Sequence, residues 1–167
     1  MVMQQAKQLL TEYQEGQASN VVSRGASKSN HTSWEPPPLV IYKVNWDAAV
    51  KHEIGRVGIG IVIRDFEGRV VASRSMQRYI FTDSYTAKSQ GALQAIIFAR
   101  DIGLRRIILE GDALQVIHSI KLNTSQFHLS RVLLWDVKFV LSHFDNWIVV
   151  HVRRNVNMAA QVLAKYA

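Results

Sequence analysis

The chain of 167 residues contains no cysteine, which excludes disulfide bonds and thiolate zinc sites. It has three prolines, all in the run 36–38, where they exclude a helix and favour an extended chain. No apolar run approaches the roughly 20 residues that span a bilayer. The N-terminal stretch also lacks the apolar core of a signal peptide. We therefore expect a soluble intracellular protein, either nuclear or cytoplasmic.

The formal net charge is +7, with 20 basic and 13 acidic residues. Residues 1–38 hold three residues of each sign, so the whole excess lies in residues 39–167. A basic folded body favours a polyanionic partner such as nucleic acid, because neutralising phosphates releases counterions. The alternative is a solvated basic surface without a partner.

Composition divides the chain near residue 34. Residues 1–17 can form a short amphipathic helix with Leu9, Leu10 and Tyr13 on one side, and residues 18–33 are rich in Ser, Asn and Gly, as in a flexible linker. We therefore expect an N-terminal tail over 1–33 and a folded domain over 34–167.

The hydrophobic pattern of the domain predicts strands and helices in the order β-β-β-α-β-α-α-β-α. The predicted strands are 40–50, 57–65, 69–76, 106–111 and 147–152, and the predicted helices are 84–102, 113–122, 129–142 and 156–167. Short connections make the first three strands an antiparallel meander, and crossovers follow. The fold class is therefore α/β, a five-stranded mixed sheet with helices on both faces.

Local signals refine this pattern at three places. Asp83 or Ser84 is placed to cap the first helix, and Gly103 is placed to end it. Gly58 and Gly60 alternate on one face of the second strand, where a helix can approach the sheet closely. Trp46 should point to the sheet face opposite Asp47 and pack there.

Several co-linear motifs resemble those of a known family. They are the opening W-x-P-P-P…Y-K-V-N-x-D-A-A at Trp34 through Ala49, the segment GIGIVIRDFEGRVVAS (58–73), the helix end at 87–103, ILEGDA (108–113), and the closing stretch 149–167. Over residues 34–167 the chain resembles the plant ribonuclease H-like domains related to the reverse transcriptases of retrotransposons.

The resemblance implies an enzyme that cuts RNA paired with DNA, using two Mg²⁺ or Mn²⁺ ions held by four carboxylates. Asp47 and Asp112 match two of these catalytic and metal-binding positions. Lys88 stands at the glutamate position of the first helix, in Ala87 through Leu93. Gln161, four residues after Asn157, stands at the fourth position, which varies within the plant group.

Lys88 opposes metal binding at this site, because an ammonium repels Mg²⁺ and is expected to pair with Asp47 and Asp112. Asp83 cannot replace the missing glutamate, since a five-residue offset turns it about 140° around the helix. Glu110 shares a strand face with Asp112 and remains a possible extra ligand. Hydrolysis is therefore expected to be absent or weak.

The resemblance also suggests where nucleic acid is bound. Arg153, Arg154 and Asn157 precede or open the last helix, near the expected site. The arginines bordering the third strand, Arg64, Arg69, Arg74 and Arg78, are further candidates for phosphate contacts. Solvated charge is the alternative for every one of these arginines.

Three functions remain open at this stage. The first is a ribonuclease H-like domain that binds RNA/DNA hybrid but has an incomplete catalytic site. The second is an active metal-dependent hybrid endoribonuclease that uses Asp47 and Asp112. The third is a non-catalytic scaffold for protein interactions. Metal-dependent cleavage would identify the second, and absence of hybrid binding at low salt would favour the third.

Overall fold

The computed structural model describes residues 33–122 and 128–167. The predicted N-terminal helix and, apart from Ser33, the predicted linker lie outside these residues. The sheet begins with β1 (Tyr42–Lys51), β2 (Arg56–Arg64) and β3 (Val70–Tyr79), which form an antiparallel meander. A 3₁₀ turn, η1 (His52–Ile54), connects the first two strands.

The sheet continues on the other side of β1. β4 (Arg106–Gly111) lies parallel to β1, and β5 (Asn146–His151) lies parallel to β4. The order across the sheet is therefore β3-β2-β1-β4-β5. This mixed five-stranded sheet confirms the predicted topology.

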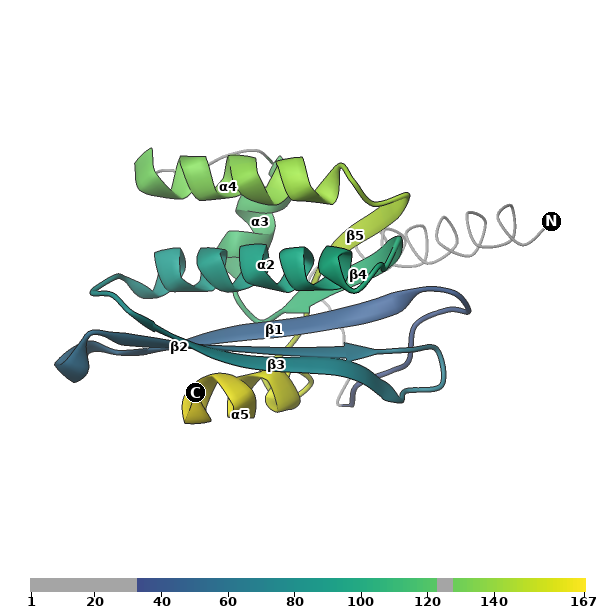
Figure 1. The fold of residues 1–167 in the computed structure, drawn as a ribbon, viewed down its shortest axis with the longest axis horizontal. Coiled ribbons are helices and arrows are strands. Elements are labelled where there is room, and N and C mark those ends of the chain that lie inside the picture. The colour runs from purple at the N-terminus through teal and green to yellow at the C-terminus, as the bar shows by residue number, and fades with distance from the viewer. Residues whose placement is uncertain (1–32, 123–127) are drawn as a thin grey trace, which may run out of the picture.

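Helices cover both faces of the sheet (Figure 1). One face carries α2 (Ser84–Asp101), α3 (Leu114–Leu122) and α4 (His128–Leu141), while α5 (Met158–Tyr166) crosses the other. The α/β fold class is thus confirmed. No helix of the described part of the chain is long and apolar enough to cross a membrane.

The ends of α2 follow the predicted signals. The Asp83 carboxylate accepts hydrogen bonds from the backbone N–H of Thr86 at 2.9 Å and from its hydroxyl at 2.7 Å. Such a cap satisfies a backbone donor that the helix leaves unpaired. Gly103 has a φ of 85°, the left-handed conformation that ends a helix at low cost for glycine.

Gly58 and Gly60 allow α5 to lie directly on β2. A Cβ atom at Gly58 would run into the backbone carbonyl of Ala164, and one at Gly60 into that of Ala160. The predicted close approach of a helix at these glycines is therefore confirmed. It fixes the height of α5 above the sheet and, with it, the position of Asn157 and Gln161.

Trp46 anchors the opposite face. Its side chain is fully buried in the main core, against Gly91 of α2 and Gly111 of β4. A Cβ atom at Gly111 would lie 2.7 Å from the indole, so the glycine makes room for the ring. Because side chains alternate along a strand, this packing turns Asp47 to the other side, as expected.

Candidate functional site

The ends of β4 and β5 lie beside the middle of β1, and the candidate residues gather there. The pairing of β1 with β4 stops at Asn45 and Glu110, and Asp47 and Asp112 lie just beyond. The backbone N–H of Val152 donates to the Gly111 carbonyl at 3.0 Å, which brings the turn with Arg153 to the same edge. This convergence reflects the topology, because parallel strands share their carboxyl-terminal edge.

Lys88 lies between the two aspartates. It is in the second turn of α2, and its Nζ lies 3.1 Å from Asp47 Oδ1 and 3.0 Å from Asp112 Oδ1. The Lys88 side chain is 22% exposed, whereas those of Asp47 and Asp112 are 6% and 11% exposed. The predicted ion-paired cluster is therefore confirmed.

Burial and charge oppose each other within this cluster. Burial raises the pKa of Asp47, the Lys88 charge lowers it, and the net shift is upward. Burial lowers the pKa of Lys88, but the carboxylates of Asp47 and Asp112 raise it more in total. The Lys88 charge is the largest of the effects that oppose the burial of Asp47.

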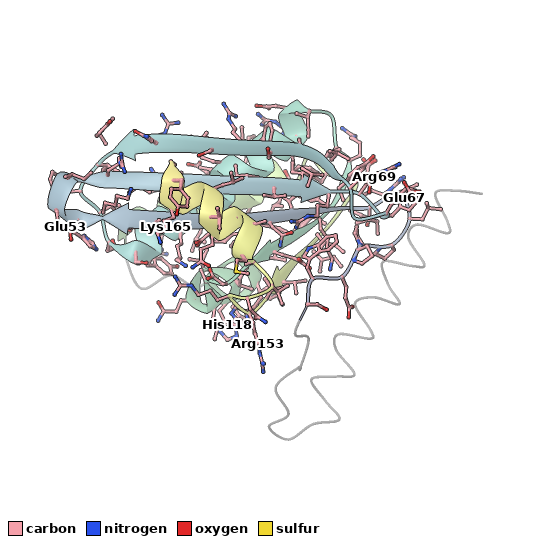
Figure 2. The ribbon with its side chains drawn as sticks, turned by 90° about the horizontal axis from the view of Figure 1, so that it is seen from below. Glu53, Glu67, Arg69, His118, Arg153 and Lys165 are labelled. Atoms are coloured by element: carbon pink, nitrogen blue, oxygen red, sulfur yellow. The ribbon has the colours of Figure 1, made fainter. Side chains whose placement is uncertain are left out.

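Gln161 and Arg154 lie together on the α5 side of the edge. In the amide orientation that satisfies both groups, the Gln161 carbonyl oxygen accepts from the Nε and the terminal nitrogen of the Arg154 guanidinium. Gln161 is thus engaged with a cation, as Asp47 is. Arg154 remains exposed, and Arg153 is partly exposed (Figure 2).

Asn157 has a different place from the one expected of a nucleic-acid contact. It is 1% exposed, and its amide nitrogen donates to the Trp46 carbonyl at 2.8 Å. Its amide oxygen accepts from Asn45 at 3.4 Å. These bonds fasten the start of α5 to β1 next to Asp47, so Asn157 positions the edge and offers no free polar group to a ligand.

The sequence did not predict a buried polar network that lies behind this edge. Lys43 Nζ pairs with Glu110 Oε1 at 2.8 Å, and Asn45 donates to Glu110 Oε2 at 3.0 Å. Trp34 covers the network and donates from its indole to Asn45 at 3.0 Å. Glu110 is therefore held by Lys43 and Asn45. The signal in the sequence is the alternation of Lys43, Asn45 and Asp47, which places all three on one strand face.

Three of the four arginines that border the third strand also have contacts within the chain. Arg64 lies 4.7 Å over the Trp34 ring and donates to Asn45 at 3.4 Å. Arg69 pairs with Asp65 at 2.9 Å, and Arg74 lies 5.4 Å over the Phe98 ring. In Figure 2 Arg69 and Glu67 mark the β2–β3 turn, and Glu53 marks the opposite end of the hairpin strands.

The order of the strands and the placing of the helices are those of a ribonuclease H-like fold. Residues 45–167 match the family model described as reverse transcriptase-like, so the chain belongs to this family. No curated protein matches the sequence.

Solved ribonucleases H share the fold. RNase H1 of Halobacterium salinarum is 24% identical with a TM-score of 0.71, over 76% of this chain and 96% of the other. The N-terminal RNase H domain of a Mycobacterium tuberculosis protein is 19% identical with a TM-score of 0.69, over 76% and 92%. LC11-RNase H1, solved in complex with RNA/DNA hybrid, is 17% identical with a TM-score of 0.68, over 75% and 95%. Plant or retrotransposon origin stays a prediction.

The residues at the edge do not fit the Mg²⁺ or Mn²⁺ ions that the resemblance implies. An ion bound by Asp47 and Asp112 would have to displace the Lys88 ammonium that both carboxylates already contact. Hard divalent cations require several oxygen ligands. Among the described residues, no group of three or more acidic or histidine side chains is placed to hold a metal ion.

Proposed function

We propose that the chain is a ribonuclease H-like domain that binds RNA/DNA hybrid and has lost hydrolysis through Lys88. The observation that carries the proposal is the position of the Lys88 ammonium, 3.1 Å from Asp47 and 3.0 Å from Asp112. In an active two-metal site the cations would stabilise the attacking and leaving oxygens of the phosphate. An ammonium on a helix supplies one positive charge but no Lewis acid and no activated water.

Binding is supported by charge at the same edge. Arg153 and Arg154 stand in the turn before α5, on the edge where the acids converge, and the folded part carries the whole basic excess. Ribonucleases H read a hybrid by groove shape, phosphates and 2′-hydroxyls, which requires cations but no base-specific groups. LC11-RNase H1, which shares the fold, was solved with such a hybrid.

The proposal is tested by measuring binding and cleavage of one labelled RNA/DNA hybrid. Fluorescence anisotropy should show binding that weakens steeply with salt, and no cleavage should occur with Mg²⁺ or Mn²⁺. The salt slope is the steepness with which the logarithm of the binding constant falls as the logarithm of the salt concentration rises. The double variant R153Q/R154Q should lower this slope by up to about 1.8, for two lost phosphate contacts. The charge-matched control is R100Q/R105Q, whose residues lie at the end of α2 and before β4, away from the acidic edge. The control should keep the slope.

Restoration of the acids tests why hydrolysis is absent. If only Lys88 and Gln161 block the chemistry, K88E/Q161D should gain metal-dependent cleavage that a further D112N change abolishes. Cleavage by the wild-type chain that D112N abolishes would instead establish the active endoribonuclease. A chain that fails to bind hybrid at low salt would contradict the proposal and favour a protein-interaction scaffold.

A further inference from the structure

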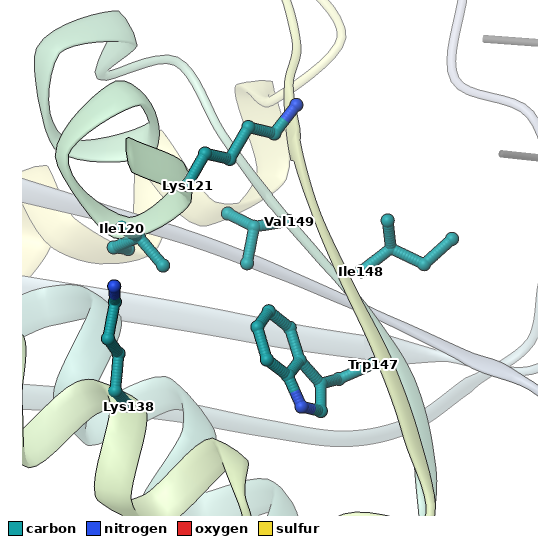
Figure 3. A pocket seen from close by; sticks show the side chains of 6 residues that line it. All are labelled: Ile120, Lys121, Lys138, Trp147, Ile148 and Val149. Atoms are coloured by element: carbon teal, nitrogen blue, oxygen red, sulfur yellow. The ribbon is translucent and has the colours of Figure 1, made fainter. Parts of the chain in front are cut away.

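A surface groove of 460 Å³ lies between α3, α4 and β5. Its lining combines apolar side chains with two lysines and one tryptophan: Ile120, Lys121, Lys138, Trp147, Ile148 and Val149. Figure 3 shows Trp147 and Val149 on the side of β5 that faces the helices, with Lys138 opposite on α4 and Lys121 at the end of α3. The volume is within the range of small-ligand sites, about 300–1,000 Å³.

The groove presents an aromatic surface together with positive charge. Trp147 is 38% exposed although it lies in a strand of the sheet, so part of its indole faces solvent. Within the ranges 33–122 and 128–167, Lys121 and Lys138 form no ion pair, and no acidic residue lines the groove. Their charges are therefore not neutralised from within this part of the chain, which favours an anionic occupant with a flat ring.

We propose that this groove binds a single-stranded nucleic-acid extension, with a base stacked on Trp147 and phosphates beside Lys121 and Lys138. The inference rests on the proposed binding of hybrid and adds a second contact to it. Stacking on an aromatic side chain accepts every base, because every base has a π-face, and lysines track the phosphates without reading sequence. The groove thus contributes affinity for an unpaired strand without sequence specificity.

The groove lies within reach of the acidic edge. Asp112 lies two residues before the start of α3, and Lys121 is near the other end of that helix. Nine helical residues rise about 13 Å, so a duplex bound at the edge needs only a short unpaired extension to reach Trp147. Ile120 and Val149, 1% and 2% exposed, close the floor of the groove, and Trp147 is its exposed aromatic side chain. The internal bases of a paired duplex are stacked on one another, whereas those of an unpaired extension are available to stack on Trp147.

The test compares one hybrid in two forms, blunt and with an unpaired extension of six thymidines, by anisotropy on the full chain. The extension should tighten binding by about 5- to 150-fold, the range of stacking on one aromatic residue. W147A should remove this advantage and leave binding of the blunt hybrid unchanged, and W147F should keep part of it. The control W135A removes an exposed tryptophan outside the groove and should keep all of it.

Two double variants that each remove two positive charges test the role of Lys121 and Lys138. K121Q/K138Q should reduce the salt slope only for the extended hybrid. K51Q/K165Q, which changes residues at the end of β1 and on α5, should affect both hybrids equally. An unchanged advantage of the extension in both W147A and K121Q/K138Q would overturn the assignment.

A hexathymidylate alone separates the groove from the proposed function. It should shift the indole N–H resonance of Trp147, identified by its loss in W147F. If the blunt hybrid fails to bind but this resonance shifts, the proposed function fails and the groove assignment stands. If the hybrid binds and the resonance does not respond, the groove assignment fails alone. Displacement of hexathymidylate by an acidic aromatic peptide would make the groove a peptide site and refute it as well.

Discussion

Replacement of Lys88 by methionine tests the electrostatic reasoning about the site directly. The change keeps most of the aliphatic stem but removes the ammonium, leaving Asp47 and Asp112 close together with side chains 6% and 11% exposed. Removing one partner of a buried ion pair costs about 3–5 kcal/mol. Because the Lys88 side chain is 22% exposed, solvent screens part of that loss, and we expect about 2–3 kcal/mol.

Thermal and urea denaturation measure this loss. For a domain of this size each kcal/mol shifts Tm by about 2–4 °C, so K88M should melt about 4–12 °C below the wild type. The triple variant D47N/K88M/D112N removes the charges together and should recover most of the loss. That recovery separates repulsion between the acids from loss of Lys88 packing.

The pH dependence of K88M follows from the pKa of Asp47. Burial already raises this pKa, and loss of the Lys88 charge, which lowers it, should raise it further. A carboxyl with a raised native pKa binds more protons in the folded state than in the unfolded state. The free energy of unfolding therefore falls as pH rises from the unfolded pKa to the native pKa. The deficit of K88M should therefore shrink toward about pH 4, near the unfolded pKa. A K88M variant within about 0.5 kcal/mol of the wild type, or a triple variant no more stable than K88M, would refute the reasoning.

Three further predictions concern stability. Because the pKa of Lys88 is raised in the folded state, its pairing stabilises the fold fully below about pH 10.5 and is lost as pH rises through the native pKa. The free energies of unfolding of the wild type and K88M should therefore converge in denaturation series at alkaline pH. E110Q leaves Lys43, which is 5% exposed, without its carboxylate and should cost about 3–5 kcal/mol in urea denaturation. The double variant K43M/E110M should regain most of this stability, and an equal loss in both variants would contradict the pairing. G60A directs a Cβ atom at the Ala160 carbonyl and should cost about 1–3 kcal/mol, against little change for the exposed control S73A; an unaffected G60A would show that α5 can shift freely.

The element order was predictable because each signal is local. The strand-forming runs of β1 and β2, the Asp83 cap and the left-handed Gly103 depend on residues close in sequence, and the structure confirms them. The bounds of β4 agree with the prediction, and the other bounds differ by at most three residues, most at the end of β3, which continues to Tyr79. That extension depends on pairing with Arg56 of β2, which no local pattern in β3 reveals.

The buried network was not predictable, because its contacts join distant segments. Lys43 meets Glu110 only because β1 and β4 pair in parallel with Asn45 opposite Glu110. The same holds for Asn157, whose amide reaches the Trp46 carbonyl across 111 positions of sequence. Asn157, whose residue type also suits nucleic-acid contact, therefore fixes α5 to β1. The groove at Trp147 likewise combines three elements that the sequence separates.

The convergence of Asp47 and Asp112 does not require catalysis, because the strand pairing of β1 with β4, the end of β4 and the packing of Trp46 place them whatever their charge. Once two carboxylates are held there, their repulsion must be offset by a cation. In a nuclease that cation is a bound metal, whereas here Lys88 supplies it from within the chain. The Lys88 ammonium therefore balances the charge of both carboxylates from within the chain. This balance explains how the fold can keep both aspartates at partly buried positions without a bound metal ion, as the proposed loss of hydrolysis requires.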